Sequence, residues 1–141
     1  MSFAARNPAQ AYAKVSMEIG VAEADPHRLI LMLFDGALLA IAKAANALQE
    51  GRIADKGHSI AQAMDIVANG LRASLNFSAG DELAERLAGL YDYMVSRLLH
   101  ANLHNDPGAL NEVSRLLREI KSSWEEIAND PAVASRNKVA T

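Results

Sequence analysis

The strongest constraint on the fold is a run of six consecutive apolar residues, Leu29–Phe34, within a segment whose two ends carry helix signals. Asp25 supplies a side-chain acceptor at the N-cap position, and Pro26 follows at the first helical position, which is the preferred start of a helix. Gly51 stands where glycine commonly closes a helix. The sequence therefore predicts one long helix from Pro26 to Leu48.

At about 100° per residue, the apolar side chains of this helix divide into two groups. The first group forms one face suited to a bundle core and consists of Ile30, Leu33, Phe34, Ala37, Ile41, Ala44 and Leu48. The second group points away from that face and consists of Leu31, Met32, Leu38 and Leu39. Because exposed contiguous apolar area usually marks a partner site, we expect the second group to be covered by something else.

Length and composition restrict the class of protein. A chain of 141 residues is long enough for one domain with a real core. The net charge is −3, and the basic patch of a nucleic-acid binder is missing. Cysteine is absent, which excludes disulfides and thiolate chemistry. No apolar run approaches the roughly 20 residues of a transmembrane helix, so we expect no membrane insertion.

The ends of the chain are expected to lie outside the bundle. Asn7-Pro8 repeats the cap-then-proline start, so we expect a short helix over residues 8–16 within an N-terminal segment, residues 1–25. So short a helix is marginal alone, and the second apolar group offers Tyr12 and its neighbours a surface. The segment is either docked permanently or acts as a lid that yields to a partner. Residues 129–141 lack periodicity and are expected to be disordered.

Three further helices are expected, over residues 53–77, 81–105 and 107–128. Their core stripes are Ile53, Ile60, Met64, Val67, Leu71 and Leu75, then Leu83, Leu87, Leu90, Met94, Leu98 and Ala101, then Leu110, Val113, Leu117, Ile120, Trp124 and Ile127. Gly70 is expected to mark either close packing against a neighbour or simple tolerance. Long helices with short connections predict an all-α fold, an antiparallel up-down four-helix bundle over residues 26–128.

The third helix also carries apolar surface beyond its core stripe. Tyr91, Val95 and Leu99 lie on its flank with Asn102 beside them, and they form a second candidate partner patch. Tyr91 and Tyr93 lie on opposite flanks, where a ring can bury its body and keep its hydroxyl in water. One of the two rings can therefore pack on a neighbouring helix while the other serves a partner.

Candidate catalytic or metal-binding groups are weak. His100 and His104 share a helix face, but the Glu of a metalloprotease motif is missing, and no Glu-x-x-His motif of a di-iron bundle occurs. Nothing in the sequence brings Asp35 and Asp92 together as a carboxylate pair. His27, in the first turn of its helix, is expected to be solvated, as is His58. We therefore expect no enzyme, no metal and no cofactor.

Several motifs, in the order and spacing found here, carry a family resemblance. They are Ala11-Tyr12, Asp25-Pro26, the run Leu29–Leu38, Tyr91-Asp92-Tyr93-Met94, Arg97-Leu98, Ala101-Asn102, Asn105-Asp106 and Trp124. Over about residues 7–128 the sequence resembles the FliS family of flagellar secretion chaperones. Two departures are mild, since Phe34 replaces the usual tyrosine and Glu23–Pro26 differs from the commoner Ala-Ser-Pro.

The resemblance implies a cytoplasmic chaperone that binds the C-terminal region of flagellin, prevents early polymerisation and delivers flagellin to the export apparatus. It also implies that the client wraps around the bundle and that the N-terminal segment covers part of the same surface. The proposed partner-binding residues are Tyr12, Leu31, Met32, Leu38, Leu39, Tyr91, Val95, Leu99 and Asn102. The alternative is a structural homodimer whose surplus apolar faces pair with each other.

Overall fold

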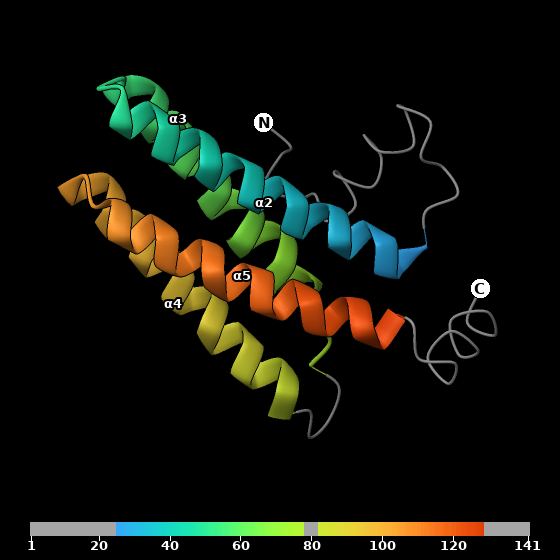
Figure 1. Cartoon of the computed structure of the whole chain (residues 1–141). Helices are drawn as coiled ribbons and strands as arrows, with labels where there is room; N and C mark the ends of the chain where they lie inside the picture. The colour runs from blue at the N-terminus through green and yellow to red at the C-terminus, as the bar shows by residue number, and fades with distance from the viewer. Residues whose placement is uncertain (1–24, 78–81, 129–141) are drawn as a thin grey trace, which may run out of the picture.

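The computed structural model describes residues 25–77 and 82–128, and in these ranges every regular element is helical. The elements are α2 (Pro26–Gln49), α3 (Ile53–Asp65), the π-helix η2 (Ile66–Leu71), the 3₁₀ turn η3 (Arg72–Ser74), α4 (Glu82–His104) and α5 (Pro107–Ala128). The predicted all-α bundle is confirmed (Figure 1). The expected helix over residues 8–16 and the expected disordered tail lie outside the described residues.

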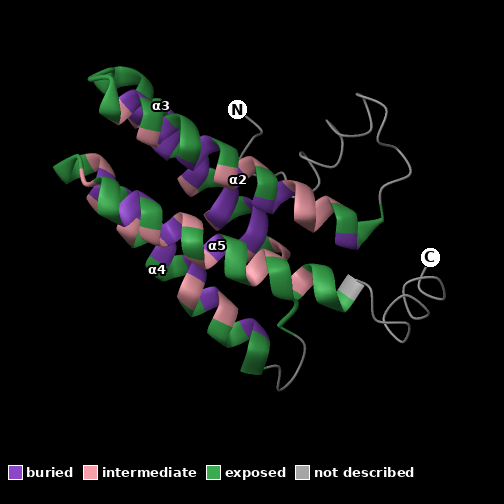
Figure 2. Ribbon diagram, in the orientation of Figure 1, coloured by how far each residue is buried: buried purple, intermediate pink, exposed green. Residues whose placement is uncertain are grey.

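Each long helix packs on two neighbours, so the helices form a ring in the order α2, α3, α4 and α5. α2 and α4 occupy opposite corners of this ring, and α3 and α5 lie between them. Buried residues line the inner sides of the helices, while exposed residues cover the outside (Figure 2). This arrangement gives one shared core and separates the outer faces of α2 and α4.

Both predicted ends of α2 are confirmed. The carboxylate of Asp25 accepts a hydrogen bond from the backbone N–H of Arg28 at 2.7 Å, and Pro26 occupies the first turn. Gly51 follows the helix with φ +75°, a left-handed conformation that favours glycine. A side-chain cap at the start and a glycine at the end therefore set the limits of the helix, as the sequence predicts.

The second helix is less regular than predicted. It is α-helical only to Asp65, widens into the π-helix η2 and ends at Ser74, so the expected continuation to Phe77 is wrong. Within η2, a Cβ added at Gly70 would lie 3.2 Å from Cδ2 of Leu33, a core residue of α2. Close packing therefore explains this glycine, and the contact is with a side chain rather than with backbone.

The core stripe of α2 is confirmed, since five of its residues are buried and Ile30 and Leu48 are half-buried against the core. In the second helix Ile60, Val67 and Leu71 are buried, but Ile53 is exposed. In α5 Leu110, Val113 and Leu117 are buried, Ile120 and Trp124 are partly buried, and Ile127 is exposed. The errors fall at the outer turns of helices, where fewer neighbours remain to cover a side chain.

The predicted core stripe of α4 is wrong in its first half. The buried residues there are Ala84, Ala88 and Tyr91, whereas Leu87 and Leu90 are half-buried and Leu83 is 60% exposed. The true stripe lies one residue further along, a rotation of about 100° around the helix axis. Small alanines leave room for close helix contact, and the large ring of Tyr91 fills the space beside them. From Met94 onward the predicted stripe is confirmed.

By length and composition alone, α2 is apolar enough to cross a membrane, contrary to the expectation that no run approaches this length. A core helix of a bundle satisfies the same criteria, and one side of α2 is packed against α3 and α5. This property is therefore weak evidence for membrane insertion.

Candidate functional site

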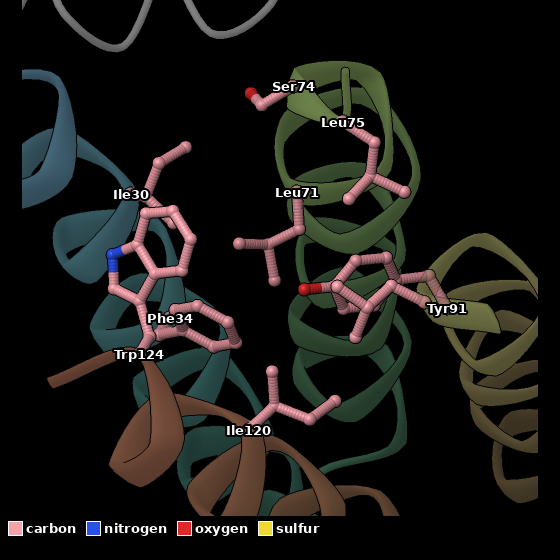
Figure 3. Close-up of a pocket in the computed structure, with 9 residues that line it drawn as sticks. Ile30, Phe34, Leu71, Ser74, Leu75, Tyr91, Ile120 and Trp124 are labelled. Atoms are coloured by element: carbon pink, nitrogen blue, oxygen red, sulfur yellow. The ribbon is translucent and has the colours of Figure 1, made fainter. Parts of the chain in front are cut away.

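One end of the bundle contains an apolar pocket of about 70 Å³ between all four helices (Figure 3). It lies where α2 and α4 begin and where η3 and α5 end. The lining residues are Ile30, Phe34, Leu71, Ser74, Leu75, Leu87, Tyr91, Ile120 and Trp124. Two of these, Leu71 and Ser74, belong to the π and 3₁₀ turns, so the irregular end of the second helix shapes one wall. The pocket is suited to an apolar group.

Tyr91 brings a polar group to this pocket. Its side chain is 3% exposed, whereas that of Tyr93 is 44% exposed, so of the two tyrosines Tyr91 is the one that packs inside the bundle. The hydroxyl points toward the pocket (Figure 3), and among the described residues it has no hydrogen-bond partner. Burial raises the pKa of Tyr91 to about 12, because the phenolate would lose its hydration. The hydroxyl is therefore a neutral donor available to whatever enters.

Trp124 forms the wall of the pocket on the α5 side and also contacts the first turn of α2. Its ring stacks on His27 with ring centroids 4.4 Å apart and an interplanar angle of 4°. Its indole N–H donates a hydrogen bond to the backbone carbonyl of His27 at 3.1 Å. His27 is buried, so the prediction that it is solvated is wrong, whereas His58 is exposed as predicted.

The second apolar group of α2 is less uniform than the helical wheel implies. Leu39 is 56% exposed, whereas Leu31, Met32 and Leu38 are half-buried. Leu38 packs against the core cluster, so it contributes to the bundle itself. Asp35 lies among these residues and forms an ion pair with Lys121 of α5 at 2.7 Å. The outer face of α2 is therefore only partly an apolar surface open to a partner.

The candidate patch on α4 is open at Leu99, which is 46% exposed, and Val95 is half-buried against the core. Asn102 is half-buried beside α3, where its side-chain oxygen would lie 3.7 Å from a Cβ at Gly57. Leu103, one turn beyond Leu99, is 68% exposed and belongs to the same outer surface. Leu103 follows Leu99 by four residues, a spacing that places two side chains on the same helix face, and the sequence prediction did not use it.

Lys56 is a buried charge that sequence reasoning missed. Its ammonium donates hydrogen bonds to the backbone carbonyl of Asn102 at 2.9 Å and to the side-chain oxygen of Asn105 at 2.6 Å. Asn105 has φ 52° and ends α4, so Lys56 places a positive charge at the C-terminus of that helix. The position of Lys56 one turn before Ile60, on the core side of α3, was the available signal.

The candidate catalytic groups are not brought together. Asp35 pairs with Lys121, while Asp92 pairs with Arg72 at 2.7 Å. The rings of His100 and His104 contact each other, and Nε2 of His100 lies 3.3 Å from a carboxylate oxygen of Asp106. Within residues 25–77 and 82–128, no three His, Cys, Asp or Glu side chains are grouped as metal ligands would be.

Fold and site together define a class: a helical-bundle protein whose distinguishing surface is apolar, with a pocket at one end and exposed leucines on opposite corners. The family model described as "Flagellar protein FliS" matches residues 8–131. The chain therefore belongs to the FliS family.

Curated relatives agree with this assignment. The flagellar secretion chaperone FliS of Salmonella typhimurium (strain LT2) is 47% identical over 119 residues, covering 84% of this chain and 88% of the relative. The protein of the same name from Escherichia coli (strain K12) is 44% identical, covering 88% and 91%. That from Bacillus subtilis (strain 168) is 34% identical, covering 87% of each chain. The relatives are named as chaperones, which are generally not enzymes.

Proposed function

We propose that this chain binds the C-terminal region of flagellin in the cytoplasm, prevents premature polymerisation and delivers flagellin to the flagellar export apparatus. The observation that carries the proposal is the exposure of leucines on two separate helices, Leu39 on α2 and Leu99 and Leu103 on α4, in a member of a chaperone family. Buried Tyr91 and half-buried Leu38 contribute through the shape of the core and of the pocket rather than as open surface.

The arrangement of the helices favours an extended client. α2 and α4 lie at opposite corners of the ring, so a compact partner that covers Leu39 does not reach Leu99 at the same time. A chain that is disordered when free can wrap around the bundle and contact both. Ordering such a client costs about 2–5 kcal/mol or more. Burial of about 80–200 Å² of apolar area offsets that amount, at roughly 25 cal/mol per Å².

The first test is titration calorimetry with a peptide spanning the last ~40 residues of a flagellin from the same cell, which in extended form reaches about 130 Å. We expect one-to-one binding with a negative heat-capacity change, the mark of apolar burial coupled to folding. Absence of binding, together with a stable dimer in sedimentation, would refute the proposal and favour the structural homodimer.

Point variants locate the surface on the bundle. Replacement of Leu38 and Leu39 together by serine is expected to abolish binding, but Leu38 also packs on the core, so Leu39→Ser is the sharper variant. Leu99→Ser tests the opposite corner. Leu83→Ser is the matched control, because Leu83 is 60% exposed and lies about 160° around the axis of α4 from Leu99. Unchanged affinity in both Leu39→Ser and Leu99→Ser would exclude these surfaces.

We also propose that the N-terminal segment, residues 1–25, competes with the client and that Tyr12 takes part. Residues 1–24 are joined to α2 at Asp25, about one turn from the pocket residue Ile30, so the pocket lies within their reach. Removal of residues 1–24 is expected to increase affinity for the flagellin peptide, and Tyr12→Ser to do so in part. Equal or weaker binding by the shortened chain would rule out competition.

A further inference from the structure

The junction between the first turn of α2 and the last turns of α5 depends on one residue pair. His27 and Trp124 stack face to face, and the indole N–H of Trp124 donates to the backbone carbonyl of His27 at 3.1 Å. Trp124 also lines the pocket. Any change that separates the two rings therefore alters both the seating of α5 on α2 and one wall of the pocket.

The surroundings of the His27 imidazole favour its neutral form. The residue is 8% exposed, and Nε2 is buried without a hydrogen-bond partner among the described residues. An imidazolium carries hydrogen on both ring nitrogens, so Nε2 becomes a donor, and no described residue accepts a hydrogen bond from it. It would also place a charge in a buried site, which costs far more than burying a neutral ring.

Burial is the largest influence on the pKa of His27 and lowers it from the ordinary value of 6.5, while the carboxylate of Asp25 and a hydrogen bond with the Trp124 backbone oppose the shift. Within residues 25–77 and 82–128, Asp25 is the one charged side chain that influences the pKa of His27. Three cations lie near the junction or on the elements around the pocket. Arg28 belongs to α2, Lys121 of α5 pairs with Asp35 and Glu125, and Arg72 of η3 pairs with Asp92 of α4. Tyr91 of α4 stays neutral here.

We propose that the His27–Trp124 junction is a proton-sensitive latch: protonation of the imidazole releases the last turns of α5 from α2 and opens the pocket at the Trp124 wall. The rest of the bundle stays folded, because the buried residues of α4 and of the first half of α5 do not depend on this pair. The latch is independent of which client the protein binds.

The direction of the pH effect follows from linkage. In the latched state the pKa of His27 lies below 6.5, and in the released state the exposed ring returns to about that value. The released state therefore binds more protons in the interval between the two pKa values. The free energy that holds the latch closed is fully present above pH 6.5 and is lost as pH falls through the pKa of His27 in the latched state. In that interval the opening equilibrium increases by up to about tenfold per pH unit.

Trp124 is the single tryptophan of the chain, so its fluorescence reports directly on the latch. The experiment follows emission wavelength and acrylamide quenching of the full chain between pH 8 and pH 5. Hydrogen exchange, corrected for the intrinsic pH dependence, gives the opening constant of the last turns of α5, with amides of Met94 and Leu98 as an internal reference. We expect red-shifted, more quenchable emission and faster exchange on acidification, confined to the end of α5.

Three variants separate the latch from general acid effects. His27→Phe keeps a ring against Trp124 without a titrating group, and His27→Gln serves the same purpose if the Phe variant does not fold. Both are expected to lose the pH dependence, whereas His58→Gln, at an exposed histidine, retains it. A flat wild-type response across this range, or the same response in a folded His27 variant, would overturn the proposal.

Discussion

Replacement of Lys56 by methionine tests how the end of the bundle opposite the pocket is held. Lys56 is 3% exposed and donates to the carbonyl of Asn102 at 2.9 Å and to the side chain of Asn105 at 2.6 Å. Methionine keeps the apolar stem of the side chain and removes the ammonium. The carbonyl at the end of α4 then loses its donor, and the helix terminus loses a positive charge.

The cost follows from these contacts. Hydrogen bonds to charged groups contribute about 1.5–3 kcal/mol each, and a cation at a helix C-terminus adds about 0.3–1 kcal/mol. The methionine side chain carries no charge, so the variant avoids the cost of desolvating the ammonium, and this offsets part of the lost stability. We therefore expect the free energy of unfolding to fall by about 2–4 kcal/mol, far more than the roughly 0.5 kcal/mol typical of an exposed substitution.

Urea unfolding followed by circular dichroism measures this loss, with Lys43→Met as control because Lys43 is exposed on α2. With a slope near 2 kcal/mol per M, the midpoint is expected to fall by about 1–2 M. Asn105→Gly retains the positive φ while removing the side-chain acceptor, so a double-mutant cycle with Lys56→Met isolates the pair. Equal midpoints for Lys56→Met and Lys43→Met would refute the assigned role.

Three further predictions concern glycines and a tyrosine. Gly89→Ala is expected to stabilise the protein by up to about 1 kcal/mol, because nothing lies within 4 Å of the added Cβ. Gly70→Ala is expected to give no gain, because its Cβ would meet Leu33 at 3.2 Å, and thermal unfolding compares the two variants. Gly51→Ala places a Cβ at φ +75° and is expected to lower stability by about 1–2 kcal/mol, measured in urea. Because the pKa of Tyr91 in the folded protein is about 12, the free energy of unfolding is expected to fall as pH rises from 10 toward 12. Tyr91→Phe should reduce that fall and remove the highest phenol step in an ultraviolet titration.

Helix limits could be predicted because their causes are local. Asp25, Pro26 and Gly51 determine the ends of α2 through a side-chain hydrogen bond, a fixed φ and a positive φ, each of which depends on one residue. The periodicity of α2 likewise gives its core face correctly. The π-turn of η2 carries no such single-residue signal, and its Gly70 faces Leu33, a residue of another helix.

The candidate site was predicted less well, because exposure depends on neighbours that the helical wheel does not contain. The wheel favours Leu83 over Ala84 for the core, yet close approach of helices selects the small side chain and leaves the leucine outside. The same shift takes Tyr91 from a predicted flank into the wall of the pocket. His27 and Lys56 were missed for a related reason: each is buried by a partner 97 or 46 residues away.

The two ends of the bundle are held by different physical interactions, and this difference bears on how the proposed client would gain access. At one end, the buried ammonium of Lys56 bridges α3 to the terminus of α4, and Arg97 pairs with Glu112 across α4 and α5. At the other end, Trp124 contacts α2 through a ring stack and one hydrogen bond beside the apolar pocket. The ion pairs near this pocket, Lys121–Asp35 and Arg72–Asp92, are partly exposed to solvent. Local opening occurs most readily where the fewest contacts must break. If partners exchange at the pocket end as proposed, the end held by Lys56, and with it the fold, is expected to stay intact.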